Sequence, residues 1–255
     1  MKSNQTLGGT RLVIGASRGI GLALARAQLA RPEVTTLVAT HRVASRLDGL
    51  RELGAQWPDK LVTAPLDVTD PRDLAELGSL AREFDGGFDL VIHAAGILHE
   101  GAMGPEKSLA RCEPDQLIKL FEVNSIAPLM TAQALLPAQP RKKRFVFAAL
   151  SAMVGSIGDN RLGGWYGYRA SKAALNQFIR TLSNECRVSH PQAAVVVLHP
   201  GTTDTALTRP FQRNIDPQRL YTPEQTAKRL LRVIDGLKPA DSGHFFNWDG
   251  SEIPW

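Results

Sequence analysis

The sequence contains few cysteines and no long apolar run, and both absences exclude whole classes of protein. Its two cysteines, Cys112 and Cys186, lack the spacing of a metal site, so we expect free, buried thiols. No stretch approaches the roughly 20 apolar residues of a membrane-spanning helix. The polar residues 1–10 lack the apolar core of a signal peptide. We therefore expect a cytoplasmic protein that binds no membrane.

Aromatic residues are also scarce, at 6% of the chain, and the formal net charge is only +5. A nucleic-acid interface usually combines a patch of Lys and Arg with aromatic side chains. The one run of basic residues, 141–144, follows Pro140, and we interpret it as a solvated loop that leads into a strand. We expect no nucleic-acid partner.

What the sequence does contain is an alternation of short apolar runs and segments of helical periodicity. Strands are expected at 12–14, 35–40, 61–64, 88–93, 144–150, 193–198 and 243–247, and helices at 20–31, 44–55, 71–84, 114–136, 167–189 and 222–237. This pattern predicts one domain over residues 1–255. The fold class is α/β, a Rossmann-type doubly wound parallel sheet of about seven strands with helices on both faces. The long connections at 97–112 and 202–221 are expected to carry functional residues.

A glycine-rich turn joins the first expected strand to the first expected helix. Residues 15–21 read Gly-Ala-Ser-Arg-Gly-Ile-Gly. Glycine allows a sharp turn and close approach of the backbone to a phosphate, and the helix N-terminus adds free N–H groups and a positive dipole. By itself the turn is equally typical of an ordinary strand–helix connection. Its place after the first strand favours binding of a dinucleotide.

The residues after the second expected strand bear on which dinucleotide is bound. An NAD-binding protein usually places an acid there, whereas this strand ends Ala-Thr-His-Arg at residues 39–42. Arg18 in the glycine-rich turn and Arg42 after the strand suit the 2′-phosphate of NADP(H). We therefore expect NADP(H) as cofactor.

Tyr168 and Lys172 are four residues apart at the start of the long helix expected at 167–189. Residues at this spacing share one face of a helix, so the ammonium group of Lys172 is expected near the Tyr168 hydroxyl. A nearby positive charge lowers the pKa of a tyrosine from about 10, which suits it to proton transfer near neutral pH. Such a pair is common by chance, so the interpretation depends on the surrounding motifs.

Taken together, the motifs resemble those of the short-chain dehydrogenase/reductase family, in particular its sniffer-like or C-factor-like carbonyl reductase branch, over essentially the whole chain. The resemblance implies catalytic roles for Ser151, Tyr168, Lys172 and Asn124. It implies cofactor contacts by Gly15, Ser17, Arg18, Gly19, Ile20, Gly21, Arg42, Asp67, Val68, Ala94, Ala95, Gly96, Asn124, Tyr168, Lys172, Pro200, Gly201 and Thr203. No metal site is implied.

Two positions depart from the family pattern. His93 and Ala94 stand where the family usually has asparagines that brace the sheet, and we expect no effect on the fold. The catalytic serine of the family usually lies three residues before a glycine, but here that residue is Ala152. Ser151 is the better candidate if a bulge turns it inward, Ser156 is the second, and a plain structural hydroxyl is nearly as well supported for Ser151. The spacing to Tyr168 also predicts an inserted loop around 156–164.

The resemblance implies transfer of a hydride from NADPH to a carbonyl, with Tyr168 as proton donor, Lys172 as modulator of its pKa, and a serine that polarises the oxygen. Asn124 is expected to help seat Lys172. The substrate is expected to be an uncharged aldehyde or ketone of medium size, near some of Met153, Trp165, Tyr166, Phe211 and Trp248. A homodimer or homotetramer is implied. The alternative function is an NADP(H)-binding regulatory or cell-signalling protein with little catalytic activity.

Overall fold

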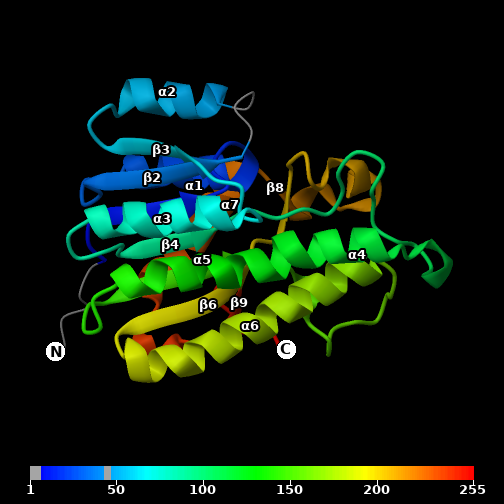
Figure 1. Cartoon of the computed structure of the whole chain (residues 1–255). Helices are drawn as coiled ribbons and strands as arrows, with labels where there is room; N and C mark the ends of the chain where they lie inside the picture. The colour runs from blue at the N-terminus through cyan, green and yellow to red at the C-terminus, as the bar shows by residue number, and fades with distance from the viewer. Residues whose placement is uncertain (1–6, 43–46) are drawn as a thin grey trace.

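Seven parallel strands form the central sheet of the protein (Figure 1). The computed structural model describes residues 7–42 and 47–255. The sheet order is β3-β2-β1-β4-β5-β6-β9, and every neighbouring pair is parallel. Its strands are β1 (Thr10–Ile14), β2 (Thr36–His41), β3 (Leu61–Pro65), β4 (Leu90–His93), β5 (Phe145–Leu150), β6 (Ala193–His199) and β9 (Phe245–Asn247). The predicted Rossmann-type sheet is confirmed.

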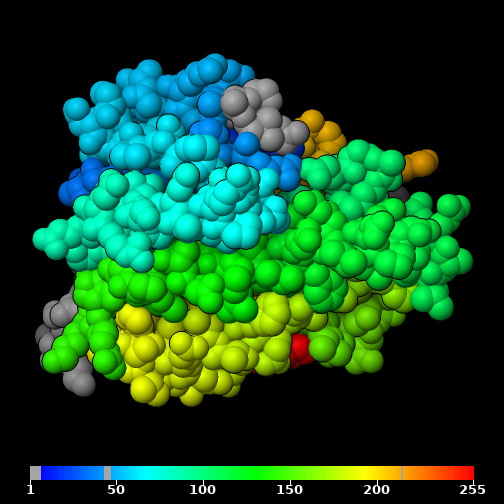
Figure 2. All heavy atoms as spheres, viewed as in Figure 1, coloured from blue at the N-terminus to red at the C-terminus, as the bar shows by residue number. Residues whose placement is uncertain are grey.

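Helices cover both faces of this sheet, because each strand has apolar side chains on both sides. One face packs against α1 (Gly19–Leu29), α2 (Asp48–Gln56) and α7 (Pro223–Gly236). The other packs against α3 (Pro71–Glu83), α5 (Ala127–Leu135) and α6 (Tyr166–Ser189). Figure 2 shows this second face, where the segments coloured from cyan to yellow cover the strands. The first part of the helix predicted at 44–55 lies outside the described residues.

The helix predicted at 114–136 is interrupted by a π-helical turn. It begins as α4 (Pro114–Phe121), widens at Glu122–Ile126 and continues as α5. The N–H of Ala127 donates to the carbonyl of Glu122, five residues earlier, and Pro128 has no N–H to donate to the carbonyl four residues before it. Such turns are frequent at functional sites, and this one contains Asn124.

The connection between β6 and α7 forms a small unit of its own. β7 (Thr202–Thr203) pairs in parallel with β8 (Leu220–Tyr221), and 3₁₀ turns at Arg209–Asn214 and Pro217–Arg219 lie between them. This pairing fixes both ends of the loop predicted at 202–221, beyond the carboxyl ends of the main strands.

The basic run 141–144 contacts helix ends rather than only solvent. Arg141 donates through Nε to the carbonyl of Ser189, the last residue of α6, at 3.1 Å. Arg144 donates to the carbonyl of Leu237, just after α7, at 2.6 Å. Cations are stabilised at the carbonyl end of a helix, so these residues have a structural role.

Among the described residues, no helix combines the length and the apolar character that a membrane span requires.

The two thiols are both free, as predicted, but only one is fully buried. Cys186 lies on the core face of α6, whereas Cys112 is half-buried after a 3₁₀ turn at Leu109–Arg111.

Candidate active site

The glycine-rich turn between β1 and α1 is the predicted phosphate cradle. Gly15 and Gly19 have φ values of 78° and 53°, in the left-handed region that favours glycine. A Cβ on Gly21 would lie 2.1 Å from the carbonyl oxygen of Gly15, so a side chain does not fit there. Arg18 precedes the helix in extended conformation and gives it no side-chain cap. The side chain of Arg18 therefore accepts no hydrogen bond from the N–H groups of the first helical turn. N–H groups in this position are suited to bind a phosphate.

The segment after β4 forms the other wall of this crevice. The N–H of Ala94 donates to the carbonyl of Ile14 at 2.9 Å, and a Cβ on Gly15 would lie 2.9 Å from Cα of Ala95. The order of the strands reverses between β1 and β4, which is where ligands bind in sheets of this kind. The structure thus brings together two motifs that are about 75 residues apart in the chain (from 21 to 94–96).

His93, at the end of β4, is buried within the sheet in regular register with Ile14 and Ala149. Burial and, secondarily, the charge of Lys172 lower the pKa of His93 to about 3. A neutral imidazole is therefore compatible with the fold at this position, as the sequence predicted.

The predicted adenosine side of the site contains Arg42, Asp67 and Val68. Asp67 accepts hydrogen bonds at Oδ1 from the N–H and the hydroxyl of Thr69, at 2.9 and 2.7 Å. Burial raises the pKa of Asp67, but these hydrogen bonds and the charges of Arg42 and Lys119 outweigh it, so the pKa is lowered overall. Asp67 is therefore a stable anion, and the charge of Arg42 contributes to its stability.

Tyr168 and Lys172 lie on the buried face of α6, one turn apart. Nζ of Lys172 is 5.9 Å from the centroid of the Tyr168 ring and donates to the carbonyl of Leu150, the last residue of β5, at 2.8 Å. Tyr168 is 8% exposed and Lys172 is 4% exposed. The side chains predicted to act together are therefore neighbours in a nearly dry environment.

The effect of this burial differs from the prediction that Lys172 lowers the pKa of Tyr168. Loss of hydration disfavours the charged form of each group, so burial raises the pKa of Tyr168 to about 12 and lowers that of Lys172 to about 7. The charge of Lys172, which acts on His93, does not offset the burial of the phenol. At neutral pH the hydroxyl of Tyr168 keeps its proton.

Asn124 joins the π-helical turn to the segment after β4. Its Oδ1 accepts from the N–H of Ile97, and its Nδ2 donates to the carbonyl of Ile97, both at 2.8 Å. Nδ2 also donates to Oγ of Ser171 at 3.1 Å. A Cβ on Gly96 would lie 3.2 Å from Oδ1 of Asn124 and 3.5 Å from Nζ of Lys172. Gly96 thus lies between these two side chains, which are predicted to act together.

Ser151 does not have the bulge that would turn it inward. β5 pairs with β6 in unbroken register up to Leu150, and Oγ of Ser151 donates to Oδ1 of Asn176 at 2.6 Å. Ala152 instead packs into the apolar cluster that contains Tyr168. Successive side chains of an extended chain point to opposite sides, so Ala152 faces the site when Ser151 does not. Oγ of Ser156 is buried and accepts from the N–H of Asp159.

An apolar wall surrounds Tyr168. The Trp165 ring lies edge-on to it, with the centroids 6.2 Å apart, and contacts the ring of Phe211 at 5.1 Å. Of the other predicted lining residues, Met153 packs in the core, Tyr166 is 45% exposed and Trp248 contacts Tyr221. The wall is completed by Ile97, Leu98, Met103, Leu120, Val123, Ala152, Val154 and Leu207.

Two residues that were not among the predicted site residues shape this region. Glu106, 2% exposed, accepts the N–H of Trp165 with its carbonyl at 2.6 Å and the N–H of Gly167 with Oε2 at 3.2 Å, and so caps α6 from another segment. His199, at the end of β6, accepts the N–H of Met153 with Nδ1 at 3.1 Å. Burial lowers the pKa of His199 to about 4, so it remains neutral and able to accept. Neither residue has a local sequence signal, apart from the place of His199 before Pro200.

The loop after β6 extends to the phosphate cradle. Gly201 has a φ of 75°, and a Cβ there would lie 2.9 Å from Cδ1 of Trp248. Oγ1 of Thr203 lies 2.8 Å from Oγ1 of Thr226 on α7. The methyl group of Thr205 lies 3.2 Å from the Cβ position of Gly19. The segment predicted to cover the cofactor therefore reaches the glycine-rich turn.

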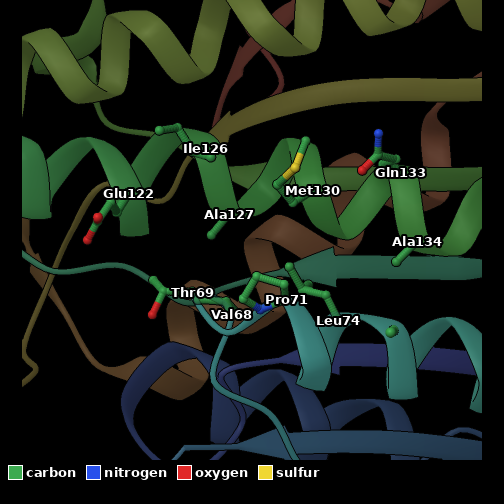
Figure 3. A pocket seen from close by; sticks show the side chains of 11 residues that line it. Val68, Thr69, Pro71, Leu74, Glu122, Ile126, Ala127, Met130, Gln133 and Ala134 are labelled. Atoms are coloured by element: carbon green, nitrogen blue, oxygen red, sulfur yellow. The ribbon is translucent and has the colours of Figure 1, made fainter.

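A pocket of about 560 Å³ lies between the start of α3 and α5, next to Val68 on the predicted adenosine side of the site (Figure 3). Its wall is mainly apolar and includes Val68, Leu74 and Met130, with Glu122 at one end. Tyr168, Lys172 and Asn124, the predicted catalytic residues, do not line it.

Comparisons with known proteins agree with this geometry. Residues 10–216 match the short chain dehydrogenase family. The chain is 32% identical to 1-hydroxy-2-glutathionyl-2-methyl-3-butene dehydrogenase of Rhodococcus sp. (strain AD45), over 96% of this chain and 99% of that protein. It is 34% identical to C-signal of Myxococcus xanthus, over 67% of this chain and 94% of that protein.

Among solved structures, the NADPH-bound carbonyl reductase from chicken fatty liver has a TM-score of 0.86 and 29% identity, covering 98% of this chain and 96% of that chain. The similarities to this reductase and to C-signal agree with the branch that the motifs indicated. This chain belongs to the short-chain dehydrogenase family.

Proposed function

We propose that this protein is an NADPH-dependent oxidoreductase that reduces the carbonyl group of an aldehyde or ketone to an alcohol. The observation that carries the proposal is the buried pair Tyr168 and Lys172. It lies on α6 against the end of β5, and Gly96 links it to the crevice that holds the glycine-rich turn.

The residues present fit a dinucleotide phosphate. Gly15, Gly19 and Gly21 allow the tight turn of the cradle, where a side chain would be strained or would clash, and the cradle offers backbone N–H groups at the start of α1. Arg18 and Arg42 are the residues that we assign to a 2′-phosphate, and Asp67 and Val68 to the adenine. The solved carbonyl reductase with 29% identity is NADPH-bound, which supports this assignment.

When bound, the cofactor supplies the hydride. Tyr168, which is protonated at neutral pH, donates its proton to the carbonyl oxygen as negative charge develops there. Burial lowers the pKa of Lys172 to about 7, so this side chain can take up or release a proton at neutral pH, and we assign to it the return of a proton to Tyr168. Asn124 fixes the backbone of Ile97 and thereby the wall of the site.

The apolar wall indicates the kind of substrate. Trp165, Phe211 and Ala152 pack in the cluster around Tyr168 and present no charge to a ligand. An uncharged aldehyde or ketone with an apolar body fits such a surface, because a charged substrate would lose its hydration without a partner. We do not assign polarisation of the carbonyl to Ser151, since its hydroxyl is bonded to Asn176.

Loss of NADPH absorbance with a panel of aldehydes, ketones and quinones tests the proposal, with NADH as the comparison cofactor. The wild type is expected to turn over at least one substrate and to prefer NADPH. Tyr168→Phe is expected to lower kcat by about 10²-fold or more, because the proton donor is lost, and to keep its affinity for NADPH.

We also propose that the protein is a homodimer or homotetramer, as the family resemblance implies. Light scattering on the wild-type preparation tests this oligomeric state.

The similarity to C-signal favours one alternative, a signalling role that needs only cofactor binding. A wild type that binds NADPH tightly, reduces nothing on the panel and signals equally well with phenylalanine at position 168 would support the alternative and reject the reductase.

A further inference from the structure

A carboxylate reaches the end of β2 from a distant part of the chain. Nη2 of Arg42, directly after β2, donates to Oε1 of Glu100 at 2.5 Å, although the two residues are 58 positions apart. The sequence predicted no acid at this place, because none follows the second strand. The structure supplies one from the connection after β4.

The backbone holds Glu100 in this position. Its N–H donates to the carbonyl of Met103 at 3.1 Å, and the N–H of Met103 donates back to the carbonyl of Glu100 at 3.0 Å. The two reciprocal bonds close a tight turn, and Met103 also packs in the apolar wall near Tyr168. Because the turn is anchored, the side chain of Glu100 remains within reach of Arg42.

The pair lies on the adenosine side of the proposed cofactor site. The charge of Arg42 acts on Asp67, in the segment that we assign to the adenine. The side chains of Arg42 and Glu100 are 39% and 46% exposed, so water screens their attraction and the ion pair is weak. A ligand with more negative charge can therefore displace the carboxylate.

We propose that Glu100 is a specificity-determining residue that competes with the 2′-phosphate of NADPH for Arg42. A phosphate monoester carries close to two negative charges and three acceptor oxygens, so it displaces the single carboxylate. Breaking the ion pair and bringing a second anion nearby lowers the affinity for NADPH. NADH has no 2′-phosphate and does not need Arg42 to be released. The inference rests on the proposed function, since it assumes that Arg42 holds this phosphate.

Glu100→Gln tests the inference, because it removes the charge and keeps the shape of the side chain. Kd values for NADPH and NADH are measured by cofactor fluorescence at low ionic strength. We expect Kd for NADPH to fall about two- to fivefold, as a half-exposed ion pair allows, and Kd for NADH to stay the same. Added salt is expected to reduce the difference. Unchanged Kd for NADPH, or an equal change for both cofactors, would overturn the inference.

Glu113→Gln is the matched control, because Glu113 is an exposed acid on the same connection and changes the net charge equally. It is expected to leave both Kd values unchanged. If it tightens NADPH binding as much as Glu100→Gln does, net charge explains the effect and the competition is rejected.

Arg42→Ala separates failure of the inference from failure of the proposed function. If it does not weaken NADPH binding, Arg42 does not hold the 2′-phosphate, and that part of the proposed function fails together with the inference. If it weakens NADPH binding and Glu100→Gln has no effect, only the inference fails. In the Arg42→Ala background, Glu100→Gln is expected to have a smaller effect on NADPH, because competition for the guanidinium is gone and only repulsion between Glu100 and the phosphate remains.

Discussion

Replacing Lys172 by methionine is expected to make the cofactor-free protein more stable and less active. Burial lowers the pKa of this lysine from 10.5 to about 7. Below pH 7 the folded protein holds a buried ammonium group, and the unfolded chain keeps its lysine charged in water up to pH 10.5. Each pKa unit corresponds to about 1.4 kcal/mol. Burial of Lys172 therefore lowers the free energy of unfolding by at most about 5 kcal/mol at pH 6 and about 2 kcal/mol at pH 9.

The direction in which stability changes with pH follows from the number of protons that each state binds. Between pH 7 and 10.5 the unfolded state binds more protons at this residue, so the stability of the wild type rises with pH. Methionine has a similar shape and no proton to bind, so the gain of Lys172→Met is largest below pH 7 and shrinks towards pH 10.5. The variant leaves the carbonyl of Leu150 without its donor, which costs about 1–3 kcal/mol at every pH. This cost is the same at both pH values, so it cancels in the difference between the gains in stability at pH 6 and pH 9, which is about 3 kcal/mol at most.

Urea unfolding at both pH values measures this difference, with Lys107→Met at an exposed lysine as control. A gain that is equal at the two pH values, or larger at pH 9, would show that burial of charge at position 172 does not act as derived. Loss of activity in the variant with no gain in stability at pH 6 would lead to the same conclusion.

Two further residues give independent expectations. His199→Leu leaves the N–H of Met153 without an acceptor and should lower the free energy of unfolding by about 1–3 kcal/mol, measured by heat or urea. His199→Asn keeps an acceptor and should lower it less. Equal losses in the two variants would refute the role of Nδ1. Since the pKa of His199 is lowered to about 4, wild-type stability should also fall as pH drops from about 6.5 towards 4, and less so in His199→Leu. Glu106→Ala should cost about 1–2 kcal/mol by uncapping α6 and should lower kcat more than it raises KM for NADPH, with partial recovery in Glu106→Gln; an unchanged kcat would mean that Glu106 does not position Tyr168.

Local patterns in the sequence were sufficient to predict the sheet and the tight turn at 15–21. A short, continuous apolar run such as 193–198 is typical of a strand buried on both faces. Gly15, Gly19 and Gly21 occupy positions where a side chain is strained or clashes. The closeness of Tyr168 and Lys172 was predicted from their spacing on a helix, and their role only from the surrounding motifs. The structure places both side chains on the buried face of α6.

Features that depend on contacts between distant segments were not predictable in the same way. Glu100 and Glu106 belong to an irregular connection, and their partners Arg42 and Gly167 are 58 and 61 positions away. The direction of Ser151 depends on whether β5 ends with a bulge, which its residues do not reveal. The pKa of Tyr168 was predicted in the wrong direction, because a sequence shows which charges are near but not how dry the surroundings are.

The contact between Gly19 and Thr205 affects how the protein matures during its synthesis. The first βα turn leaves the ribosome early, but the segment that closes over it is made 186 positions later, after β6 has joined the sheet. A nascent chain that has just completed α1 therefore has only an open half of its nucleotide pocket. We therefore expect a dinucleotide to bind with full affinity only after the segment around Thr205 has been translated, so that it stabilises the finished protein more than early folding intermediates.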